Sequence, residues 1–239
     1  DGEYRLFEIT PEDDFAKKLQ QMKAENVDGF NVTVPYKQKI IPYLDEVDEV
    51  AREMEAVNTV VLRDGKWIGY NTDGIGYIRS VEHFYPDFFD EMNKKVLILG
   101  AGGAARAIYH ALKERGIVQI DIANRTREKA EDIAKLGKTT CQTTVYSIDE
   151  AEKFLQDYDL IIQTTSVGMK SITLEPIVEI KELKQNAIVS DIVYQPLKTK
   201  FLQGAEEKQG RLLFGHSMLL YQAQYAFEIW TDIFVDVSE

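Results

Sequence analysis

The sequence contains few of the residues that build disulfides or metal sites. Among its 239 residues there is one cysteine, Cys141, so no disulfide can form within the chain, and this fits a reducing cytoplasm. The three histidines, His83, His110 and His216, lack the spacing of metal ligands with one another or with Cys141. We therefore expect no metal site.

Long apolar runs and an excess of positive charge are also lacking. No stretch approaches the roughly 18 apolar residues of a membrane span, and the first five residues do not form a signal peptide. Acidic side chains outnumber basic ones by 40 to 28, which gives a net charge of −12. Broad nucleic-acid or anionic-membrane surfaces need a basic face, so we expect neither partner. The chain starts at Asp1 rather than Met, which leaves open that its natural start lies earlier.

The remaining composition is that of a globular α/β protein. With 44% hydrophobic and 28% charged residues, 239 residues allow one large or two ordinary domains, and the polar stretch 87–94 is the expected boundary. Beyond it, strand and helix patterns alternate, which predicts a parallel sheet covered by helices on both faces. Strands are expected at 96–99, 118–123, 142–146, 158–162, 187–190 and 212–214, and helices at 103–115, 127–136, 149–156, 198–209 and 215–234.

Before the boundary, the patterns are shorter and more mixed. Strands are expected at 6–9, 29–34, 57–62 and 66–70, an inward-packing helix from about 11 to 26, and a charged, exposed helix at 46–55. Asp64-Gly65 predicts a hairpin turn. Lys37 follows Pro35 at an expected strand-to-helix junction, and Asp73 is expected at or beside the N-cap of the next helix.

A dinucleotide-binding turn follows the first strand of the alternating region. Gly100 permits a tight exit from the strand, Gly102 lets the backbone approach a pyrophosphate, and Ala105 takes the third small position, where helix and strand pack closely. The phosphates would lie on free N–H groups at the helix N-terminus. The alternative is a glycine-rich turn without a ligand, but the flanking strand and helix favour the nucleotide.

The tip of the next strand favours NADP over NAD. It carries Arg125 and Thr126, which can grip a 2′-phosphate, and Lys129 adds charge one turn later. The competing interpretation takes Asp121 as the ribose ligand of an NAD site. Asp121 lies about three residues before the tip, inside the strand, which disfavours it. Arg125 as an ordinary surface cation also remains open.

Oxidation or reduction of a hydroxylated carbon needs a group that exchanges the hydroxyl proton, and Lys37 and Asp73 are the candidates. From spacing alone, a solvated Lys37 and a simple capping role for Asp73 remain strong alternatives. Tyr194 and Lys198 have the Tyr-x-x-x-Lys spacing of short-chain reductases. That pair must lie one helical turn apart, and Pro196 between them argues against it.

Eight ordered blocks of the sequence resemble the shikimate dehydrogenase family, from about Tyr4 to Asp236. They are Asn31-Val-Thr33-Val-Pro35-Tyr-Lys37, Ala56-Val-Asn58-Thr59, Gly69-Tyr-Asn71-Thr-Asp73-Gly74, Gly100-Ala-Gly-Gly-Ala, Asn124-Arg-Thr126, Thr165-Ser-Val-Gly-Met169, Asp191-Ile-Val-Tyr194-x-Pro196 and Gly215-x-x-Met218-Leu-x-x-Gln222. The resemblance implies NADPH-dependent, reversible reduction of 3-dehydroshikimate to shikimate in chorismate and aromatic amino-acid biosynthesis, in the cytoplasm, with a homodimer left open. A quinate/shikimate dehydrogenase using NAD and a non-catalytic nucleotide sensor are the alternatives.

The resemblance also implies a fold and a set of roles. The fold would be α/β in two domains: an N-terminal α/β substrate domain over 1–91 and a Rossmann-type, doubly wound NADP domain over 92–213. A helix in 214–239 would return to the substrate domain. Lys37 would be the general acid/base and Asp73 its partner, with shikimate also bound by Thr33, Asn58, Tyr194 and Gln222. NADP(H) would be bound by Gly100, Ala101, Gly102, Gly103, Ala104, Asn124, Arg125, Thr126, Lys129, Ile192, Gly215 and Met218.

Two departures from the family pattern stand out. The family opens with a strand and a Ser-x-Ser segment that binds the substrate carboxylate, and nothing before Tyr4 supplies them. We therefore expect a truncated chain that lacks the first strand and helix of the substrate domain. The second departure is Gln163, where Asn often leads the block that ends at Met169.

Overall fold

The computed structural model describes residues 2–33, 35–91, 93–137 and 140–237. The chain divides into two compact units, Asp1–Tyr70 and Asn71–Glu239. The division differs from the expected boundary at 91/92 because one helix, α3 (Asp73–Phe84), packs on helices of the second unit rather than on the first. Met92, at that boundary, lies outside the described residues.

The first unit is built on a four-stranded sheet of order β1-β3-β4-β2. Strands β1 (Gly29–Asn31), β3 (Thr59–Arg63) and β4 (Lys66–Tyr70) are antiparallel neighbours, and β2 (Glu46–Val47) pairs parallel with β4. The hairpin expected at Asp64-Gly65 is confirmed, with φ values of 50° and 76° at its two turn residues. Positive φ at both residues matches the right-handed twist of the strands.

Helix α1 (Phe15–Ala24) forms within the expected range of about 11 to 26, and it begins after the acidic residues of the expected helix start. Asp14 caps it by accepting a hydrogen bond from the Lys17 N–H, and the apolar spacing buries Leu19 and Met22 against the sheet. The core behind this helix is completed by other buried apolar side chains, namely Val32, Ile40, Ala51, Val57, Val60 and Trp67.

Three expectations for this unit were wrong. Residues 6–9 form no strand, and Leu6 is 92% exposed. The segment after Pro35 makes turns and a short 3-10 helix, η1 (Ile41–Tyr43), in place of a helix. The helix expected over 46–55 is shorter, since Glu46–Val47 is strand β2 and only Glu49–Met54 is helical (α2), with Ala51 and Met54 buried. Val34, in an expected strand, lies outside the described residues.

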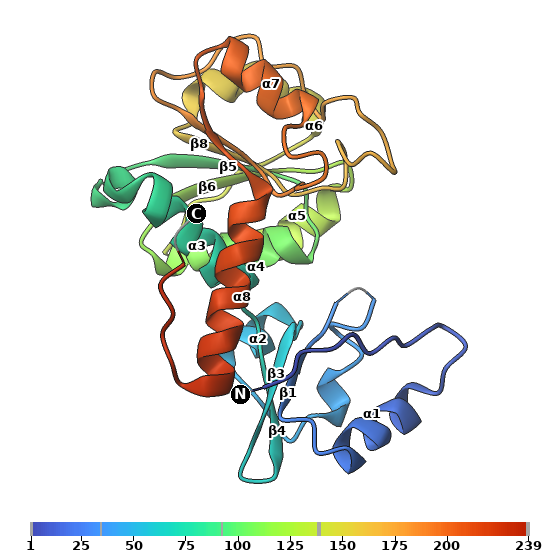
Figure 1. The fold of residues 1–239 in the computed structure, drawn as a ribbon. Helices are drawn as coiled ribbons and strands as arrows, with labels where there is room; N and C mark the ends of the chain where they lie inside the picture. Colours follow the sequence, from blue (N-terminus) through green and yellow to red (C-terminus); the bar gives the residue numbers. More distant parts are fainter. Residues whose placement is uncertain (1, 34, 92, 138–139, 238–239) are drawn as a thin grey trace. The chain divides into compact units, whose positions relative to one another are not determined.

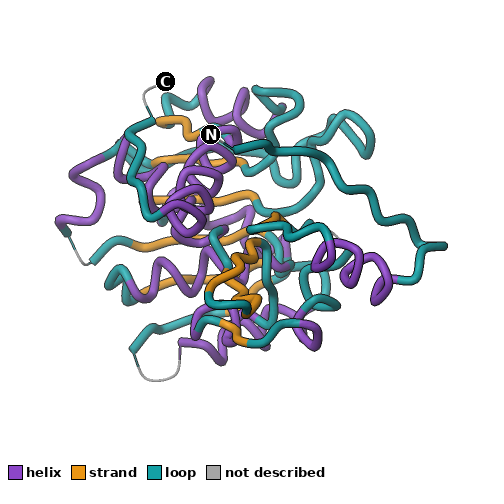
Figure 2. The backbone as a smooth tube through the Cα atoms, turned by 60° about the horizontal axis from the view of Figure 1, so that its bottom comes forward, coloured by secondary structure: helices purple, strands orange, loops and turns teal. Residues whose placement is uncertain are grey.

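The second unit has a six-stranded parallel sheet of order β10-β9-β8-β5-β6-β7, as the alternating pattern predicted. The strands are β5 (Lys95–Leu99), β6 (Gln119–Ala123), β7 (Val145–Tyr146), β8 (Leu160–Gln163), β9 (Ile188–Asp191) and β10 (Arg211–Leu213). The chain order reverses between β5 and β8, so the crevice beyond the carboxyl ends of these strands is the switch point where doubly wound folds bind ligands. Figure 2 shows these strands side by side among the helices.

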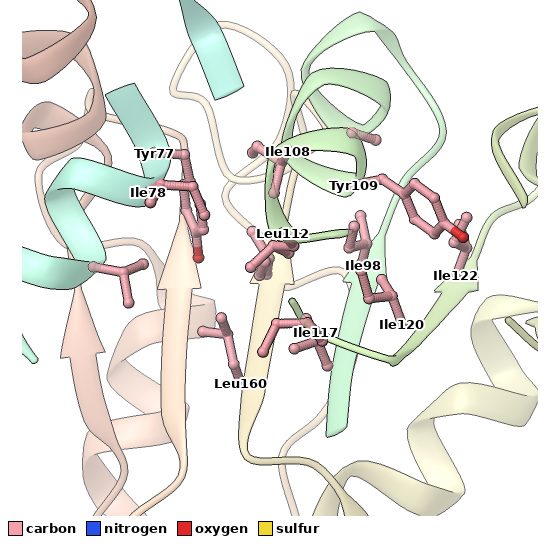
Figure 3. Packing of buried hydrophobic residues seen from close by; sticks show 14 of the residues in the cluster. Tyr77, Ile78, Ile98, Ile108, Tyr109, Leu112, Ile117, Ile120, Ile122 and Leu160 are labelled. Atoms are coloured by element: carbon pink, nitrogen blue, oxygen red, sulfur yellow. The ribbon is translucent and has the colours of Figure 1, made fainter. Parts of the chain in front are cut away.

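Helices cover both faces of this sheet (Figure 1). One core is formed with α3, α4 (Gly103–Glu114), α5 (Arg127–Ala134) and α8 (Gly215–Thr231). The core on the other face is formed with α6 (Ile148–Ala151) and α7 (Lys200–Glu207). The short 3-10 helices are η2 (Pro86–Asp90), η3 (Lys135–Gly137) and η4 (Glu152–Asp157). Alternate side chains of β5 point to opposite faces of the sheet and so pack in different cores. Ile98 faces α4 beside Ile108 and Leu112 (Figure 3), whereas Leu97 faces α7.

Two glycines let α3 pack closely on its neighbours in the second unit. A Cβ added at Gly74 would lie 2.5 Å from the carbonyl oxygen of Ala107 in α4. A Cβ at Gly76 would lie 2.6 Å from the backbone nitrogen of Gln222 in α8. An ion pair between Arg79 and Glu228, 2.7 Å long, adds a polar link between α3 and α8. Helix α3 is therefore fixed between α4 and α8.

No helix among the described residues is long and apolar enough to cross a membrane. The same residues contain no cluster of three or more histidine, cysteine, aspartate or glutamate side chains that could hold a metal ion.

Candidate active site

The glycine-rich turn adopts the geometry that a dinucleotide site needs. Gly100 has φ +115°, and a Cβ there would lie 2.6 Å from the Thr164 hydroxyl of the neighbouring strand end, so only glycine fits. Gly102 is the N-cap of α4 and Gly103 its first residue, both are exposed, and nothing lies within 4 Å of a Cβ built at either. Ala105 is fully buried, as expected for the third small position. The turn therefore presents an open helix N-terminus, where backbone N–H groups and the helix dipole favour a phosphate.

The basic tip lies at the end of β6, directly before α5. The Asn124 side chain donates a 2.7 Å hydrogen bond to the carbonyl oxygen of Thr126, which closes the turn. Arg125, Thr126 and Lys129 are exposed, and among the described residues no carboxylate pairs with Arg125 or Lys129. The neighbouring Arg127, in contrast, pairs with Glu131 at 2.9 Å. The tip therefore offers two cations whose charge is not neutralised by an ion pair.

Asp121, the competing ribose ligand, is unsuited to that role. Its side chain is buried inside β6, where one carboxylate oxygen accepts from the Thr144 N–H at 2.8 Å and the other from the Tyr158 hydroxyl at 2.9 Å. Lys95 lies 3.7 Å from the same carboxylate. Burial also raises the pKa of the Tyr158 hydroxyl. Asp121 thus connects strands inside the fold, in agreement with the argument from its position in the sequence.

The start of α8 lies directly against the backbone that follows β9. A Cβ at Gly215 would come within 2.5 Å of the Ile192 carbonyl carbon and oxygen, so glycine is required for this approach. Met218, one turn into α8, is buried in the core on which Ile192 packs. The structure therefore brings together Ile192, Gly215 and Met218, the three residues expected beside the nicotinamide.

Asp73 and Gln222 come from α3 and α8 of the same unit. Asp73 is the first residue of α3 and is buried, and its backbone N–H donates to the Asn71 side chain at 3.0 Å. Gly76, three residues later on the same helix face, is in contact with the backbone of Gln222. The close packing of α3 on α8 therefore brings Gln222 to within about one helical turn of Asp73.

The first unit holds three further polar candidates on two chain segments, which backbone hydrogen bonds join. The Val32 N–H donates to the Asn58 carbonyl at 2.8 Å, and the Val57 N–H donates to the Lys37 carbonyl at 2.8 Å. The Tyr36 N–H donates to the Thr33 carbonyl at 2.8 Å. Thr33, Lys37 and Asn58 therefore share one end of this sheet, with Asn58 buried and Lys37 half-buried.

The side chain of Asn58 is oriented by neighbours that sequence reasoning missed. The Thr59 hydroxyl donates to the Asn58 side-chain oxygen at 3.0 Å, and the Asn31 amide lies 3.3 Å from that hydroxyl. Because the oxygen of Asn58 is the accepting atom here, its amide N–H groups are directed elsewhere. The only signal in the sequence was the presence of Asn31 and Thr59 in the blocks that contain Thr33 and Asn58.

Tyr194 lies in an irregular segment after β9 and is 47% exposed. The segment between Tyr194 and Lys198 is not helical, so the reductase-like spacing of these two residues has no structural basis. Directly before this segment, Asp191 is fully buried at the end of β9. Burial raises its pKa to about 6, although three hydrogen bonds act in the opposite direction. The sequence places Asp191 at the start of one of the family-like blocks but indicates no role for it.

Known proteins resemble this chain over nearly its whole length. A family model described as shikimate dehydrogenase substrate binding domain matches residues 1–60, and one described as shikimate / quinate 5-dehydrogenase matches residues 86–196. The curated shikimate dehydrogenase (NADP(+)) of Oceanobacillus iheyensis is 54% identical over 240 aligned residues, which cover 100% of this chain and 84% of the relative. The chain belongs to the shikimate dehydrogenase family.

Solved structures agree with this membership. Shikimate dehydrogenase from Aquifex aeolicus matches with a TM-score of 0.83 and 41% identity, covering 96% of this chain and 81% of that one. The Thermus thermophilus enzyme in complex with NADP(H) and shikimate matches with a TM-score of 0.78 and 28% identity, covering 95% and 81%. The two-domain α/β fold expected from the sequence is therefore confirmed for this chain.

The second unit has the features that a bound NADP(H) requires. The open N-terminus of α4 fits a pyrophosphate, since Gly102 and Gly103 leave its N–H groups uncovered. The cations Arg125 and Lys129 fit a 2′-phosphate. An acid at the strand tip, which would repel that phosphate, is replaced by Asn124.

Proposed function

We infer that this chain is an NADP-dependent shikimate dehydrogenase, which catalyses the reversible reduction of 3-dehydroshikimate to shikimate. The observation that carries the inference is the 54% identity to a curated enzyme of that name along the full chain. The activity is that of an oxidoreductase acting on a secondary alcohol, and it belongs to aromatic amino-acid biosynthesis. Its substrate is a small hydroxylated acid.

We propose which residues hold NADP(H). The pyrophosphate lies on the turn Gly100–Ala104 at the N-terminus of α4, and its negative charge is stabilised there by the helix dipole. Arg125 and Lys129 bind the 2′-phosphate, Thr126 donates a hydroxyl to it, and Asn124 holds the turn closed. Ile192, Gly215 and Met218 border the nicotinamide, and their mutual packing supports this role.

We propose that the substrate binds to six polar side chains. Thr33, Lys37 and Asn58 come from the sheet end of the first unit, and Asp73 and Gln222 come from α3 and α8. Tyr194 follows β9. In domain terms, residues 1–91 bind substrate together with the helix in 214–239, and residues 92–213 bind NADP(H). Helix α8 packs on α3, whose residues lie within 1–91 although α3 is part of the second compact unit, and this packing supports grouping the last helix with the substrate-binding residues.

In the proposed mechanism, Lys37 and Asp73 handle the proton at the substrate hydroxyl. Bound NADPH supplies the hydride that reduces the ketone carbon. The Lys37 ammonium donates a proton to the oxygen on which negative charge develops, and in the reverse direction the neutral amine accepts that proton. The Asp73 carboxylate accepts hydrogen bonds from the substrate hydroxyl groups and orients them. Asn58 is a further hydrogen-bonding group for the substrate, and its side-chain oxygen is held by the Thr59 hydroxyl at 3.0 Å.

The test is the fall in NADPH absorbance when 3-dehydroshikimate is added to purified protein. We expect Lys37→Ala to lower kcat by about 10²- to 10⁴-fold and to leave the affinity for NADPH nearly unchanged, because a lost general acid affects the chemical step. Lys39→Ala is the matched control, since Lys39 lies two residues away and is exposed, with its ammonium over the ring of Tyr36. A Lys37→Ala enzyme as fast as Lys39→Ala would reject the assignment.

The alternatives have less support. A quinate/shikimate dehydrogenase using NAD is disfavoured by the unneutralised cations of the β6 tip, and comparison of initial rates with each nucleotide and each acid separates the two. A nucleotide sensor would bind NADPH but leave 3-dehydroshikimate unconverted. The presence of Lys37, Asp73 and the other substrate positions argues against it.

The proposal includes a cytoplasmic location, which is supported by the single, buried and unpaired Cys141. A homodimer is the proposed assembly, and sedimentation equilibrium of the purified protein tests it.

A further inference from the structure

A chain of buried polar groups connects the ends of β8 and β9. Gln163 is the last residue of β8, Asp191 is the last residue of β9, and both are fully buried. Their Cα atoms are partners in the parallel ladder, and the Gln163 amide nitrogen donates to an Asp191 carboxylate oxygen at 3.1 Å. The two side chains therefore meet at the switch-point edge of the sheet, although they are distant in the sequence.

The Gln163 amide is held in one orientation by the loop that follows it. Its nitrogen also donates to the Val167 carbonyl at 2.8 Å, and its oxygen accepts a hydrogen bond from the Thr165 N–H. The Thr165 hydroxyl in turn accepts from the Val167 N–H at 3.1 Å. Both ends of the amide are thus used, and a side chain without them would leave the loop 164–169 without these contacts.

The Asp191 carboxylate holds the segment after β9 in the same way. One of its oxygens accepts from the Val193 N–H at 2.9 Å as well as from Gln163, and the other accepts from the Thr199 hydroxyl at 2.6 Å. Thr199 is the N-cap of α7, since its hydroxyl also accepts from the Leu202 N–H. One carboxylate therefore connects three segments: the end of β8, the chain after β9 and the start of α7.

The groups that donate hydrogen bonds to this carboxylate are neutral. Among the described residues no cation lies within ion-pair distance of Asp191, whereas the buried Asp121 has Lys95 at 3.7 Å. A buried charge held by neutral donors costs free energy that an apolar side chain would not cost. This cost indicates that the arrangement serves the conformation of the two loops rather than the stability of the sheet.

Both loops lie against positions that we assign to the cofactor. Thr164 and Thr165, directly after Gln163, line the space above Gly100, at 2.6 and 2.8 Å from a Cβ built there. Ile192, directly after Asp191, lies against Gly215. A displacement of either loop would therefore move atoms next to the pyrophosphate turn or next to the residues that border the nicotinamide.

We propose that Gln163 and Asp191 are positioning residues for the dehydrogenase reaction, which set the loops 164–169 and 192–199 in the conformation that receives the nicotinamide half of NADP(H). The proposal rests on the proposed function. Neither side chain acts on the reacting atoms. Each acts through backbone groups, Gln163 through Thr165 and Val167, and Asp191 through Val193.

The experiment compares loss variants at these two positions with a matched loss elsewhere. Asp191→Ala and Gln163→Leu remove the connections, and Asp191→Asn is the conservative variant, since its oxygen can still accept from Val193 and Gln163. The control is Asp121→Ala, which removes a carboxylate that is equally buried and bonded to two neighbours, but lies inside β6. For each protein we measure Tm, the dissociation constant of NADP+, kcat and the KM for NADPH.

We expect Asp191→Ala and Gln163→Leu to raise the KM for NADPH and to lower kcat, with a combined fall in kcat/KM of about 10²-fold, as for a misplacement of about 1 Å. Asp191→Asn is expected to stay within about threefold of wild type. Asp121→Ala is expected to have a lower Tm than wild type but kinetic constants within twofold of the wild-type values. If Asp191→Ala does not fold, Gln163→Leu, which leaves the carboxylate bonded to Val193 and Thr199, carries the test.

A loss of Tm without kinetic change in Gln163→Leu and Asp191→Ala, as in Asp121→Ala, would overturn the positioning role. Failure of the proposed function gives a different pattern. The wild type would then leave 3-dehydroshikimate unconverted, while the dissociation constants for NADP+ would still separate Asp191→Ala from Asp121→Ala.

Discussion

The contact between α3 and α8 can be tested with a single methyl group. Gly76 is the fourth of the 12 residues of α3, and a Cβ there would meet the backbone nitrogen of Gln222 at 2.6 Å and its Cα at 2.8 Å. The shorter distance is about 0.8 Å less than the 3.4 Å at which ordinary contact begins. Because the contacted atoms are backbone atoms of a second helix, they cannot move aside as a flexible side chain can. Gly76→Ala must therefore push α8 away from α3.

Two opposing effects set the size of the change. Alanine in a helix interior is more favourable than glycine by about 1 kcal/mol. Overpacking of a buried contact costs about 1–3 kcal/mol, and we expect the upper end because a backbone must shift. The free energy of unfolding of Gly76→Ala should therefore fall by about 2 kcal/mol. Since Gln222 moves with α8, kcat/KM for shikimate should also fall, by about tenfold.

The matched control is Gly204→Ala in α7. A Cβ at Gly204 meets nothing within 4 Å, so only the helix propensity changes and the variant should gain about 1 kcal/mol. The assay is urea unfolding of both variants and of wild type, followed by steady-state kinetics with shikimate. The two substitutions should change the free energy of unfolding in opposite directions. If Gly76→Ala were as stable as Gly204→Ala, the close packing of α3 on α8 would be refuted.

Two further predictions concern charged groups. Arg125→Ala should raise the KM for NADPH by about 10- to 100-fold, because it removes one or two charge-assisted hydrogen bonds to the 2′-phosphate. NADH lacks that phosphate, so its KM should not change. Arg127→Ala is the kinetic control and should match wild type, because the Arg127 guanidinium already pairs with Glu131. Burial raises the pKa of Asp191 from 3.8 to about 6, so the folded state binds more protons than the unfolded state between these values. The stability contributed by this group is therefore present at low pH and is lost as the pH rises through about 6, by up to about 3 kcal/mol. Asp191→Asn removes this titration, so urea midpoints of wild type should decline relative to those of the variant between pH 4 and pH 7, and parallel curves would contradict the assignment.

Local patterns predicted the second unit well because each of its elements is specified by its own residues. The run Val96–Leu99 and the turn at Gly100 require a buried strand followed by a tight bend, whatever the rest of the chain does. Right-handed crossovers between parallel neighbours then place the connecting helices on the faces of the sheet, whereas the strand order β10-β9-β8-β5-β6-β7 came from the structure. The basic tip at Arg125 was predictable for the same reason, since the carboxyl ends of parallel strands share one edge of the sheet.

The first unit was less predictable because its elements depend on partners. Residues 6–9 are mostly apolar, like a short strand, but the described sheet offers them no paired neighbour, so their backbone stays irregular. In the same way, the segment after Pro35 is held by single hydrogen bonds, such as that from Val57 to Lys37, rather than by a helical ladder. Such contacts link distant residues, and periodicity carries no information about them.

The boundary between the two compact units was also hard to predict from the sequence. The acidic stretch 87–94 has the composition of a linker, yet the compact units divide between Tyr70 and Asn71. The reason lies in Gly74 and Gly76, which give α3 a flat face for α4 and α8. Two glycines in a helix indicate that something approaches closely, but the sequence alone does not tell which element it is.

The two buried aspartates of the parallel sheet show how position on a strand separates structure from function. Asp121 lies in the middle of β6, and its partners Thr144, Tyr158 and Lys95 connect elements whose places are already set by the ladder. Asp191 lies at the end of β9, where the ladder stops after one further hydrogen bond, from the Ile192 N–H to the Gln163 carbonyl oxygen at 3.0 Å. A carboxylate at that point can order a loop that would otherwise have several conformations. The ordered loop then fixes the geometry of the binding site next to it. The free-energy cost of burying a charge without a cation is therefore incurred at the strand end, where conformation and not sheet stability limits the reaction.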